Sequence, residues 1–242
     1  MLSFVCKETD RQLTNDELRL SFPEEWQLLG GENLEKSVIF LTENKHVYLK
    51  SNRDGERPIF IDIDSELSYH QKTFKETSIN KQPLYKALGL SRGEWVDDLT
   101  AGLLGDSLLM YSMGLNIRAY ERHIIPQILI TNALKTCTLL DSSRFIFFPK
   151  GASYLLDQDL TGRTLYFDPM FEDPNHKTAP KKEMRIFRSV VTVDHDAEKL
   201  LEELIAKKPR RIIVKRPLRS RSLGKTPSHS IEGKSTRYDV YL

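Results

Sequence analysis

The sequence predicts an α/β protein whose main domain is a doubly wound, mostly parallel sheet with helices on both faces. From Glu94 onwards, short apolar runs alternate with helical patterns, and this alternation is typical of a parallel sheet. We expect strands at 94–98, 116–120, 144–148, 163–167 and 210–215, with helices between them at about 105–113, 124–136, 181–190 and 196–206. The closing residues 237–242 alternate with a period of two and predict a final strand.

A small α+β unit with antiparallel strands is expected before the main domain. Three β-rich runs, at Ser37–Leu41, His46–Leu49 and Pro58–Ile63, follow polar and irregular residues 1–35, which hold a possible short helix near Asn15–Leu20. The first two runs are joined by a hairpin-like connection, residues 42–45. Residues 64–80 are polar, and a helix is expected at Gln82–Leu88, stopped by Gly89. The sequence therefore predicts two domains, residues 1–80 and residues 81–242.

Composition favours a cytoplasmic protein with a polyanionic partner. The 242 residues are 39% apolar, which suffices for a core, and no apolar run approaches the roughly 20 residues of a membrane span. Cys6 and Cys137 form neither a disulfide framework nor a metal-ligand spacing, so no metal is expected. Residues 207–237 hold 11 Lys and Arg but one acid, Glu232, which indicates nucleic acid; a solvated basic loop is the alternative.

The segment Asp168–Phe171 (Asp-Pro-Met-Phe) directly follows the apolar run 164–167, where ligands bind in open α/β sheets. Asp168 can accept a hydrogen bond from an amine, Pro169 stiffens the turn, and Phe171 offers a face on which a base can stack. The alternative is a turn whose acid caps the next helix and whose phenylalanine fills the core. This segment predicts recognition of a flat molecule that carries an amino group.

Three other strand ends carry residues that suit a nucleotide-like cofactor. The first strand runs into a glycine loop at 98–106, although Thr100 stands where a dinucleotide fingerprint has its first glycine. The second ends at Glu121, 23 residues beyond Asp98, close to the spacing of an acid that binds ribose hydroxyls. The third leads to small residues, 151–153, that leave room for adenine. The alternative for the glycine loop is a tight βα turn, and that for Glu121 is an acid that begins a helix. The alternative for residues 151–153 is a turn with no ligand.

Taken in order, the four strand ends match an S-adenosylmethionine (SAM)-dependent methyltransferase, and the sequence resembles the bacterial RsmJ family, small-subunit ribosomal RNA methyltransferase J. The resemblance covers most of residues 36–242. Its segments are 98–103, Asp106, 120–122, 166–171, 181–187, 214–217 and the closing 237–241. The runs Asp-Pro-Met-Phe and Lys-Lys-Glu-Met-Arg are its most specific parts. The chain departs from the family pattern at Leu104, near a family glycine, and at Gly105, near a family arginine.

The resemblance implies a class I SAM-dependent methyltransferase, with an antiparallel C-terminal strand, that methylates guanine N2 in 16S ribosomal RNA or the small ribosomal subunit. The catalytic residues it implies are Asp168, Pro169 and Phe171. The expected cofactor-binding residues are Asp98, Thr100, Gly102, Gly105, Asp106, Glu121, Arg122, Gly151, Ala152, Ser153 and Asp168. The expected RNA-binding residues are Lys181, Lys182, Arg185, Lys215, Arg216, Arg219 and Arg221. For Arg122, a surface salt bridge is the alternative.

Three other functions remain open at this point. A glycine loop with a following acid also fits an NAD-dependent oxidoreductase, although the missing first glycine argues against it. A methyltransferase of the same architecture could act on another RNA, a protein or a small molecule. The altered glycine loop also allows a catalytically inactive RNA-binding relative.

Overall fold

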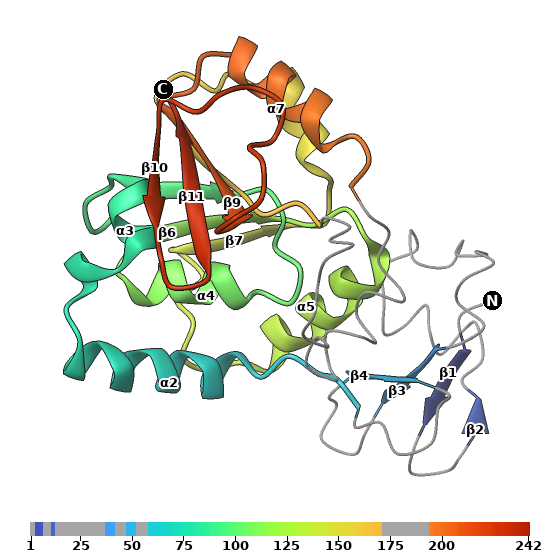
Figure 1. Cartoon of the computed structure of the whole chain (residues 1–242). Helices are drawn as coiled ribbons and strands as arrows, with labels where there is room; N and C mark the ends of the chain where they lie inside the picture. Colours follow the sequence, from blue (N-terminus) through green and yellow to red (C-terminus); the bar gives the residue numbers. More distant parts are fainter. Residues whose placement is uncertain (1–2, 7–10, 13–36, 42–46, 52–57, 171–193) are drawn as a thin grey trace. The chain divides into compact units, whose positions relative to one another are not determined.

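The computed structural model describes residues 3–6, 11–12, 37–41, 47–51, 58–170 and 194–242 (Figure 1). The chain divides into two compact units. The first comprises Met1–Asp62, His123–Thr138 and Glu172–Thr192, and the second comprises Ile63–Arg122, Leu139–Phe171 and Val193–Leu242. Within the described part of the chain, no helix has the length and apolar character that crossing a membrane requires.

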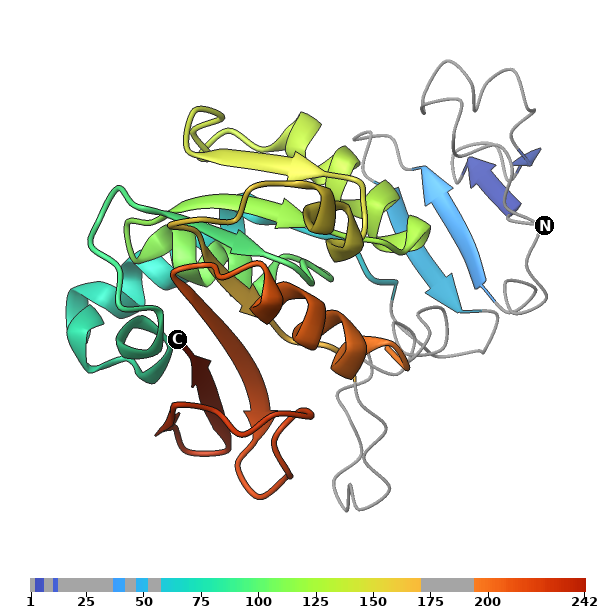
Figure 2. The same ribbon diagram turned by 90° about the horizontal axis from the view of Figure 1, so that it is seen from above.

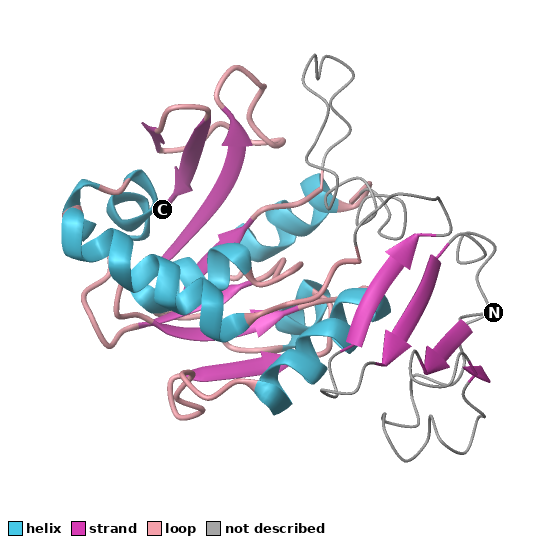
Figure 3. Cartoon of the chain, turned by 90° about the horizontal axis from the view of Figure 1, so that it is seen from below, coloured by secondary structure: helices cyan, strands magenta, loops and turns pink. Residues whose placement is uncertain are grey.

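The first unit contains a four-stranded sheet in the order β2-β1-β3-β4. Figure 3 draws its strands in magenta. Its elements are β1 (Ser3–Cys6), β2 (Arg11–Gln12), β3 (Ser37–Leu41), β4 (Val47–Ser51) and helix α5 (Ile124–Thr136). The antiparallel pairing of β3 with β4 confirms the predicted hairpin. The N–H of Val47 donates to the side-chain oxygen of Asn132 at 2.8 Å and joins β4 to α5.

The second unit is built on a seven-stranded sheet in the order β10-β11-β9-β8-β5-β6-β7. The strands are β5 (Trp95–Asp98), β6 (Asn116–Tyr120), β7 (Phe145–Phe148), β8 (Thr164–Phe167), β9 (Arg211–Pro217), β10 (His229–Glu232) and β11 (Thr236–Tyr241). β5 to β9 are mutually parallel, and β11 is antiparallel to both of its neighbours, β9 and β10. The chain moves outward from β5 through β6 to β7 and then returns to place β8 on the other side of β5. The strand order therefore reverses between β5 and β8.

Helices cover both faces of this sheet, as the sequence predicts (Figures 1 and 2). They are α2 (Ile63–Glu76), the 3₁₀ turn η3 (Ile79–Lys81), α3 (Pro83–Leu88), α4 (Gly105–Ser112), the 3₁₀ turn η4 (Ala152–Asp157) and α7 (Ala197–Ala206). α7 and η4 pack on one face and α4, with α2 against it, on the other. Leu165 and Phe167 of β8 and Val214 of β9 face the core under α7. Because side chains alternate along a strand, Tyr166 and Lys215 face α4.

The strands and helices predicted after residue 94 are confirmed to within about two residues wherever the structure describes them, as is the helix ending at Leu88. Two predictions were wrong. The strand at Pro58–Ile63 is a single bridge at Ile59, and residues 1–35, interpreted as irregular, contain β1 and β2. Helix α2, in the segment 64–80 that was described only as polar, was missed. The basic loop also contains β10. The predicted helices near Asn15–Leu20 and at 181–190 lie outside the described residues, and the division at residue 80 stays a prediction.

α2 escaped the sequence interpretation because its apolar face is narrow. Ile63, Leu67 and His70 are buried and Phe74 is half-buried. They recur at helical spacing, but the polar residues between them dominate the composition. A count of helix periodicity in this window would have found the helix.

Candidate active site

The candidate site lies at the carboxyl ends of β5 and β8, where the strand order reverses. In open α/β sheets the loops at such a point leave in opposite directions and open a crevice for a ligand. The Leu99 N–H donates to the carbonyl of Tyr166 at 2.9 Å, so the ends of these two strands are held together. The glycine loop and Asp168, which the sequence singled out separately, therefore begin side by side.

The glycine loop folds against the end of β6. The Ala101 N–H donates to the Tyr120 carbonyl at 2.9 Å, and the Gly102 N–H donates to Oε2 of Glu121 at 2.8 Å. Gly102 has φ of 54°, in the left-handed region that glycine occupies without strain. Glu121 is only 5% exposed. The structure thus brings the predicted ribose-binding acid to the glycine loop.

At Leu104 the loop has a backbone conformation that glycine favours, and at Gly105 it borders open space. Leu104 has φ of 68°, a left-handed conformation that disfavours a branched side chain, and its side chain is fully buried. A Cβ built on Gly105 would meet no atom within 4 Å, so open space lies beside the first residue of α4. The loop therefore has, at residue 104, the left-handed conformation that a glycine favours. Burial of the Leu104 side chain in the core holds it there.

Asp98 is a buried carboxyl group at the end of β5, 1% exposed. Its Oδ1 accepts a hydrogen bond from the Thr100 N–H at 3.1 Å, and its Oδ2 accepts one from the Ser107 hydroxyl at 2.5 Å. Burial raises the pKa of Asp98 to about 7, although the Ser107 hydrogen bond opposes the shift. The neighbouring carboxylate of Asp106 raises this pKa further. The site therefore favours a positive charge, which would stabilise the ionised form of Asp98.

Asp168 is the most exposed of the carboxylates at the crevice, with 34% of its side chain accessible. Its N–H donates to Oγ1 of Thr100 at 2.8 Å, and its Oδ2 accepts from Nζ of Lys215 at 2.9 Å. Burial raises the pKa of Asp168 to about 6, and the Lys215 ammonium opposes this shift. Asp168 can therefore be ionised near neutral pH and accept hydrogen bonds from a ligand.

Asp106, in the first turn of α4, connects β8 and β9 through one oxygen. Its Oδ2 accepts from Nζ of Lys215 at 2.8 Å and from the Tyr166 hydroxyl at 2.5 Å. Burial raises the pKa of Tyr166 well above its usual range, so this hydroxyl stays a donor. The sequence interpretation missed Tyr166, whose signal is a hydroxyl-bearing residue inside an otherwise apolar strand.

The turn after Asp168 is fastened by an acid that the sequence interpretation also missed. Oδ2 of Asp194 accepts from the Met170 N–H at 2.6 Å, and the Asp194 N–H donates to the Met170 carbonyl at 3.2 Å. Arg122 forms ion pairs with Asp194 and, at 2.9 Å, with Asp196. The predicted alternative for Arg122, a salt bridge, is thus present, and no local pattern in the sequence marks Asp194 as its partner.

The small residues after β7 lie at the same edge of the sheet, two strands from β5. Gly151 precedes η4, Ala152 is buried in the core under α7, and Ser153 is exposed. A Cβ at Gly151 would lie 3.1 Å from Cβ of Arg122, so a larger residue would press on the end of β6. Pro169 is buried beside Asp168, whereas Phe171 lies outside the described residues.

Two of the predicted RNA-binding residues are at least partly buried and bound to other groups of the protein. Lys215 is engaged with Asp106 and Asp168, as described above. Arg216 is 8% exposed, and its Nε donates to the backbone carbonyl of Arg221 at 2.9 Å. A contact of either side chain with surface phosphates is therefore not supported. Arg219 and Arg221 are exposed, and Lys181, Lys182 and Arg185 lie outside the described residues.

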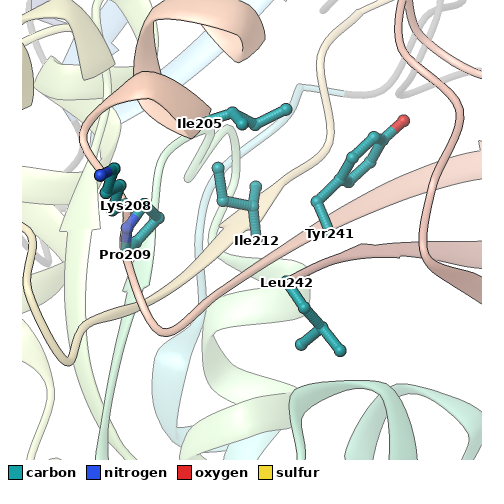
Figure 4. A pocket seen from close by; sticks show the side chains of 6 residues that line it. All are labelled: Ile205, Lys208, Pro209, Ile212, Tyr241 and Leu242. Atoms are coloured by element: carbon teal, nitrogen blue, oxygen red, sulfur yellow. The ribbon is translucent and has the colours of Figure 1, made fainter.

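A small apolar pocket lies away from this crevice (Figure 4). It has a volume of about 130 Å³ and is lined by Ile205, Lys208, Pro209, Ile212, Tyr241 and Leu242. Ile212 is near the start of β9, whereas Lys215 lies toward its end, so the pocket opens at the opposite edge of the sheet. Among the described residues, no group of three or more His, Cys, Asp or Glu side chains is arranged to hold a metal ion.

Comparison with known proteins agrees with this architecture. The family model for SAM-dependent methyltransferases matches residues 21–242. The ribosomal RNA small subunit methyltransferase J of Thioalkalivibrio sulfidiphilus is 32% identical over 227 residues, 88% of each chain. Its namesake in Bdellovibrio bacteriovorus is 33% identical over 228 residues, 88% of this chain and 85% of its own. A solved SAM-dependent methyltransferase from Neisseria gonorrhoeae has the same fold, with a TM-score of 0.65, 23% identity and coverage of 99% and 95%.

Fold and site together define a class I SAM-dependent methyltransferase, an enzyme whose cofactor is SAM. More particularly, the chain belongs to the ribosomal RNA small subunit methyltransferase J family. The oxidoreductase alternative is thereby set aside. The residues at the crevice also fit SAM, because the Gly102 turn and the open space beside Gly105 admit a ligand at the backbone. Glu121 suits ribose hydroxyls, and Asp98 suits a cationic group.

Proposed function

We propose that this enzyme transfers the methyl group of SAM to the exocyclic N2 amine of a guanine in 16S ribosomal RNA, in the cytoplasm. The observation that carries the proposal is the Asp168 carboxylate, which is partly exposed where the strand order reverses. Thr100 accepts from the backbone N–H of Asp168, and Lys215 donates to its Oδ2. The names of the relatives support the RNA substrate. The guanine amine is supported by the site, since a carboxylate accepts hydrogen bonds from N–H groups.

The cofactor would lie along three strand ends. Glu121 would bind the ribose hydroxyls, and the glycine loop with Asp98 and Asp106 would surround the amino-acid portion. The small residues 151–153 would flank the adenine. When bound, SAM supplies a methyl group already activated by a positively charged sulfur. What the protein must add is alignment of the acceptor nitrogen and a polar environment.

Asp168 and the carbonyl of Pro169 would provide both. They would accept the two N–H groups of the amine and direct its nitrogen at the methyl carbon. The Asp168 carboxylate would stabilise the positive charge that develops on the nitrogen as it takes the methyl group from SAM, whose sulfur leaves neutral. The surplus proton would pass to Asp168 or to water. Positioning of this kind can lower a barrier by roughly 7–11 kcal/mol in favourable cases, and Phe171 would stack on the base.

The RNA phosphates would contact the loop that follows β9. Arg237 donates to the carbonyls of Leu218 at 3.1 Å and Ser220 at 2.6 Å, and Arg216 donates to that of Arg221. Two arginines thus hold the loop backbone from inside, while the side chains of Arg219 and Arg221 are exposed. The loop begins at the carboxyl end of β9, the same edge of the sheet as Asp168, so it would guide the target strand to the crevice.

The salt dependence of RNA binding tests this surface. Each lost phosphate contact should reduce the slope of log K against log[salt] by about 0.7–0.9. Arg219→Ala/Arg221→Ala should therefore reduce it by roughly 1.4–1.8 in filter binding to 16S ribosomal RNA. The control is Lys207→Ala/Lys225→Ala, which removes two exposed lysines at the opposite edge. Equal slopes in the two double variants would place the RNA elsewhere.

Methyl transfer itself is measured with radiolabelled SAM and either 16S ribosomal RNA or small subunits from cells lacking the enzyme, followed by nucleoside mass spectrometry. We expect N2-methylguanosine as the product. Asp168→Asn should reduce kcat at least a hundredfold with SAM affinity nearly unchanged, because the amide oxygen would accept from Lys215 and leave the NH2 group, which only donates, facing the amine. Glu202→Gln, an equivalent change at an exposed residue of α7, is the control. A methyl group on another atom or on no RNA at all would contradict the proposal.

A further inference from the structure

Lys215 stands out because its ammonium lies inside the candidate active site. Phe167 pairs with Val214 in the parallel register of β8 and β9, so the next residues along the two strands are Asp168 and Lys215. On its other side Lys215 is paired with Tyr238 of β11, which is 8% exposed. The lysine side chain itself is 24% exposed. Its position is therefore fixed by the sheet register on both sides.

The ammonium joins two carboxylates that come from different elements. Nζ lies 2.8 Å from Oδ2 of Asp106 in α4 and 2.9 Å from Oδ2 of Asp168 after β8. Among the described residues, Lys215 is the side chain that donates a hydrogen bond to the Asp168 carboxylate. This contact uses Oδ2 and leaves Oδ1 directed elsewhere. One cation thus fixes the orientation of the carboxylate to which the mechanism assigns the acceptor amine.

The charged and titratable groups around Asp168 are mostly acidic. They come from β5, α4, β8, the residues before α7, β9 and β11, and they are Asp98, Asp106, Tyr166, Asp194, Lys215 and Tyr238. Asp106 and Asp194 disfavour ionisation of Asp168, as does burial, whereas Lys215 favours it. An opposite charge in direct contact lowers a carboxyl pKa by roughly 1–3 units. Without the ammonium, Asp168 would hold its proton to a higher pH, and the protonated group would be a weaker acceptor for the amine.

We propose that Lys215 is a positioning residue of the methyl-transfer centre, which keeps Asp168 ionised and oriented toward the acceptor amine. This inference rests on the proposed function, and it assigns Lys215 a different partner from the RNA phosphates that the sequence predicts. An ammonium shared by two carboxylates has little charge to offer a phosphate. The same contacts hold the start of α4 and the end of β8 at a fixed separation across the crevice.

The test compares Lys215→Met, which keeps the length of the side chain, with Lys215→Arg, which keeps the charge. Lys207→Met, at an exposed residue, is the control. The rate kcat should rise with pH as Asp168 ionises, and Lys215→Met should move this acid limb upward by about one pH unit or more. We expect a loss of kcat of about fivefold or more at pH 6 and a smaller loss at pH 9. Lys215→Arg should keep the limb close to that of the wild type.

A second readout needs no RNA. In protein labelled with ¹³C-aspartate, the Asp168 carboxyl signal, assigned through Asp168→Asn, reports its titration directly. Lys215→Met should move this titration upward by the same amount as the kinetic limb. If Lys215→Met shifts the Asp168 titration but the wild-type enzyme methylates no RNA, the proposed function is rejected and the electrostatic role of Lys215 stands.

Two results would overturn the inference. If Lys215→Met lowers only the melting temperature and leaves both titrations in place, the lysine merely supports the fold. If it changes KM for RNA and the salt slope while kcat and both titrations stay as in the wild type, Lys215 binds phosphate as the sequence predicts.

Discussion

Replacing Asp98 by asparagine should reveal how much stability the buried carboxyl group costs the protein without cofactor. Asparagine has nearly the same shape, and its oxygen can still accept from the Thr100 N–H. Its amide group can donate to the Ser107 hydroxyl, which now donates to Oδ2 of Asp98. The substitution therefore removes the charge and retains the packing.

The sign of the effect follows from the direction of the pKa shift. The pKa of Asp98 is raised from 3.8 to about 7, so the folded state binds this proton more tightly than the unfolded state. Below pH 3.8 both states are protonated and the carboxyl group costs nothing; the cost grows with pH and levels off above pH 7. At about 1.4 kcal/mol per pKa unit the full cost is about 4 kcal/mol, of which roughly 2–3 kcal/mol develops between pH 5 and pH 8.

Urea unfolding at pH 5 and pH 8 measures this cost. The free energy of unfolding of Asp98→Asn, relative to wild type, should increase by roughly 2–3 kcal/mol between the two pH values. Asp157→Asn, the same change at an exposed residue, serves as control. A difference between Asp98→Asn and wild type that is equal at both pH values would refute the argument that burial holds this carboxyl group protonated.

Three further predictions concern the same crevice. Leu104→Gly should destabilise the protein although it relieves a positive φ, because loss of a buried leucine costs about 2–5 kcal/mol and the relief returns about 1–2 kcal/mol. Leu104→Ala, which keeps the positive φ, should be less stable still. A glycine variant that is more stable than wild type in urea unfolding would contradict this. Thr100→Val leaves the Asp168 N–H without its acceptor, so kcat should fall roughly tenfold while Thr100→Ser stays near wild type, and equal rates for both would disprove the role. SAM, which is cationic at sulfur, should gain affinity relative to S-adenosylhomocysteine between pH 6 and pH 8 in calorimetry as Asp98 ionises; a constant ratio would argue against it.

The sequence allowed the parallel sheet to be predicted because each of its strands is a short apolar run with a helix pattern after it. It also allowed the order of the strand ends to be predicted, and the predicted residues that lie at the crevice include Asp98, Thr100, Gly102, Asp106, Glu121 and Asp168. Strand polarity alone accounts for this success. In a parallel sheet every carboxyl end lies at the same edge, so residues that follow strands are brought together.

The roles of Lys215 and Arg216 could not be predicted in this way, because charge in a sequence carries no direction. Both were assigned to RNA as part of a basic segment. Within β9 they alternate between two faces: Lys215 faces the acids at the start of α4, and Arg216 supports a loop backbone on the other side. Asp194 was missed for a different reason, since its partner Met170 is 24 residues away and no local pattern records their contact.

The pairing of Asp98 with Tyr166 ties the enzyme's chemistry to a single alignment of two strands that lie 68 residues apart in the chain. A slip by one residue would turn the Tyr166 hydroxyl into the apolar layer beneath α7 and aim Phe167 at the acid that begins α4. The hydroxyl would then lie among apolar side chains and the phenyl ring beside a carboxylate. The misaligned form would therefore lose both the Tyr166 hydrogen bond and the packing of Phe167. The contacts of Asp98 and Tyr166 therefore disfavour the misaligned form, so that a correctly aligned sheet and a complete crevice arise together.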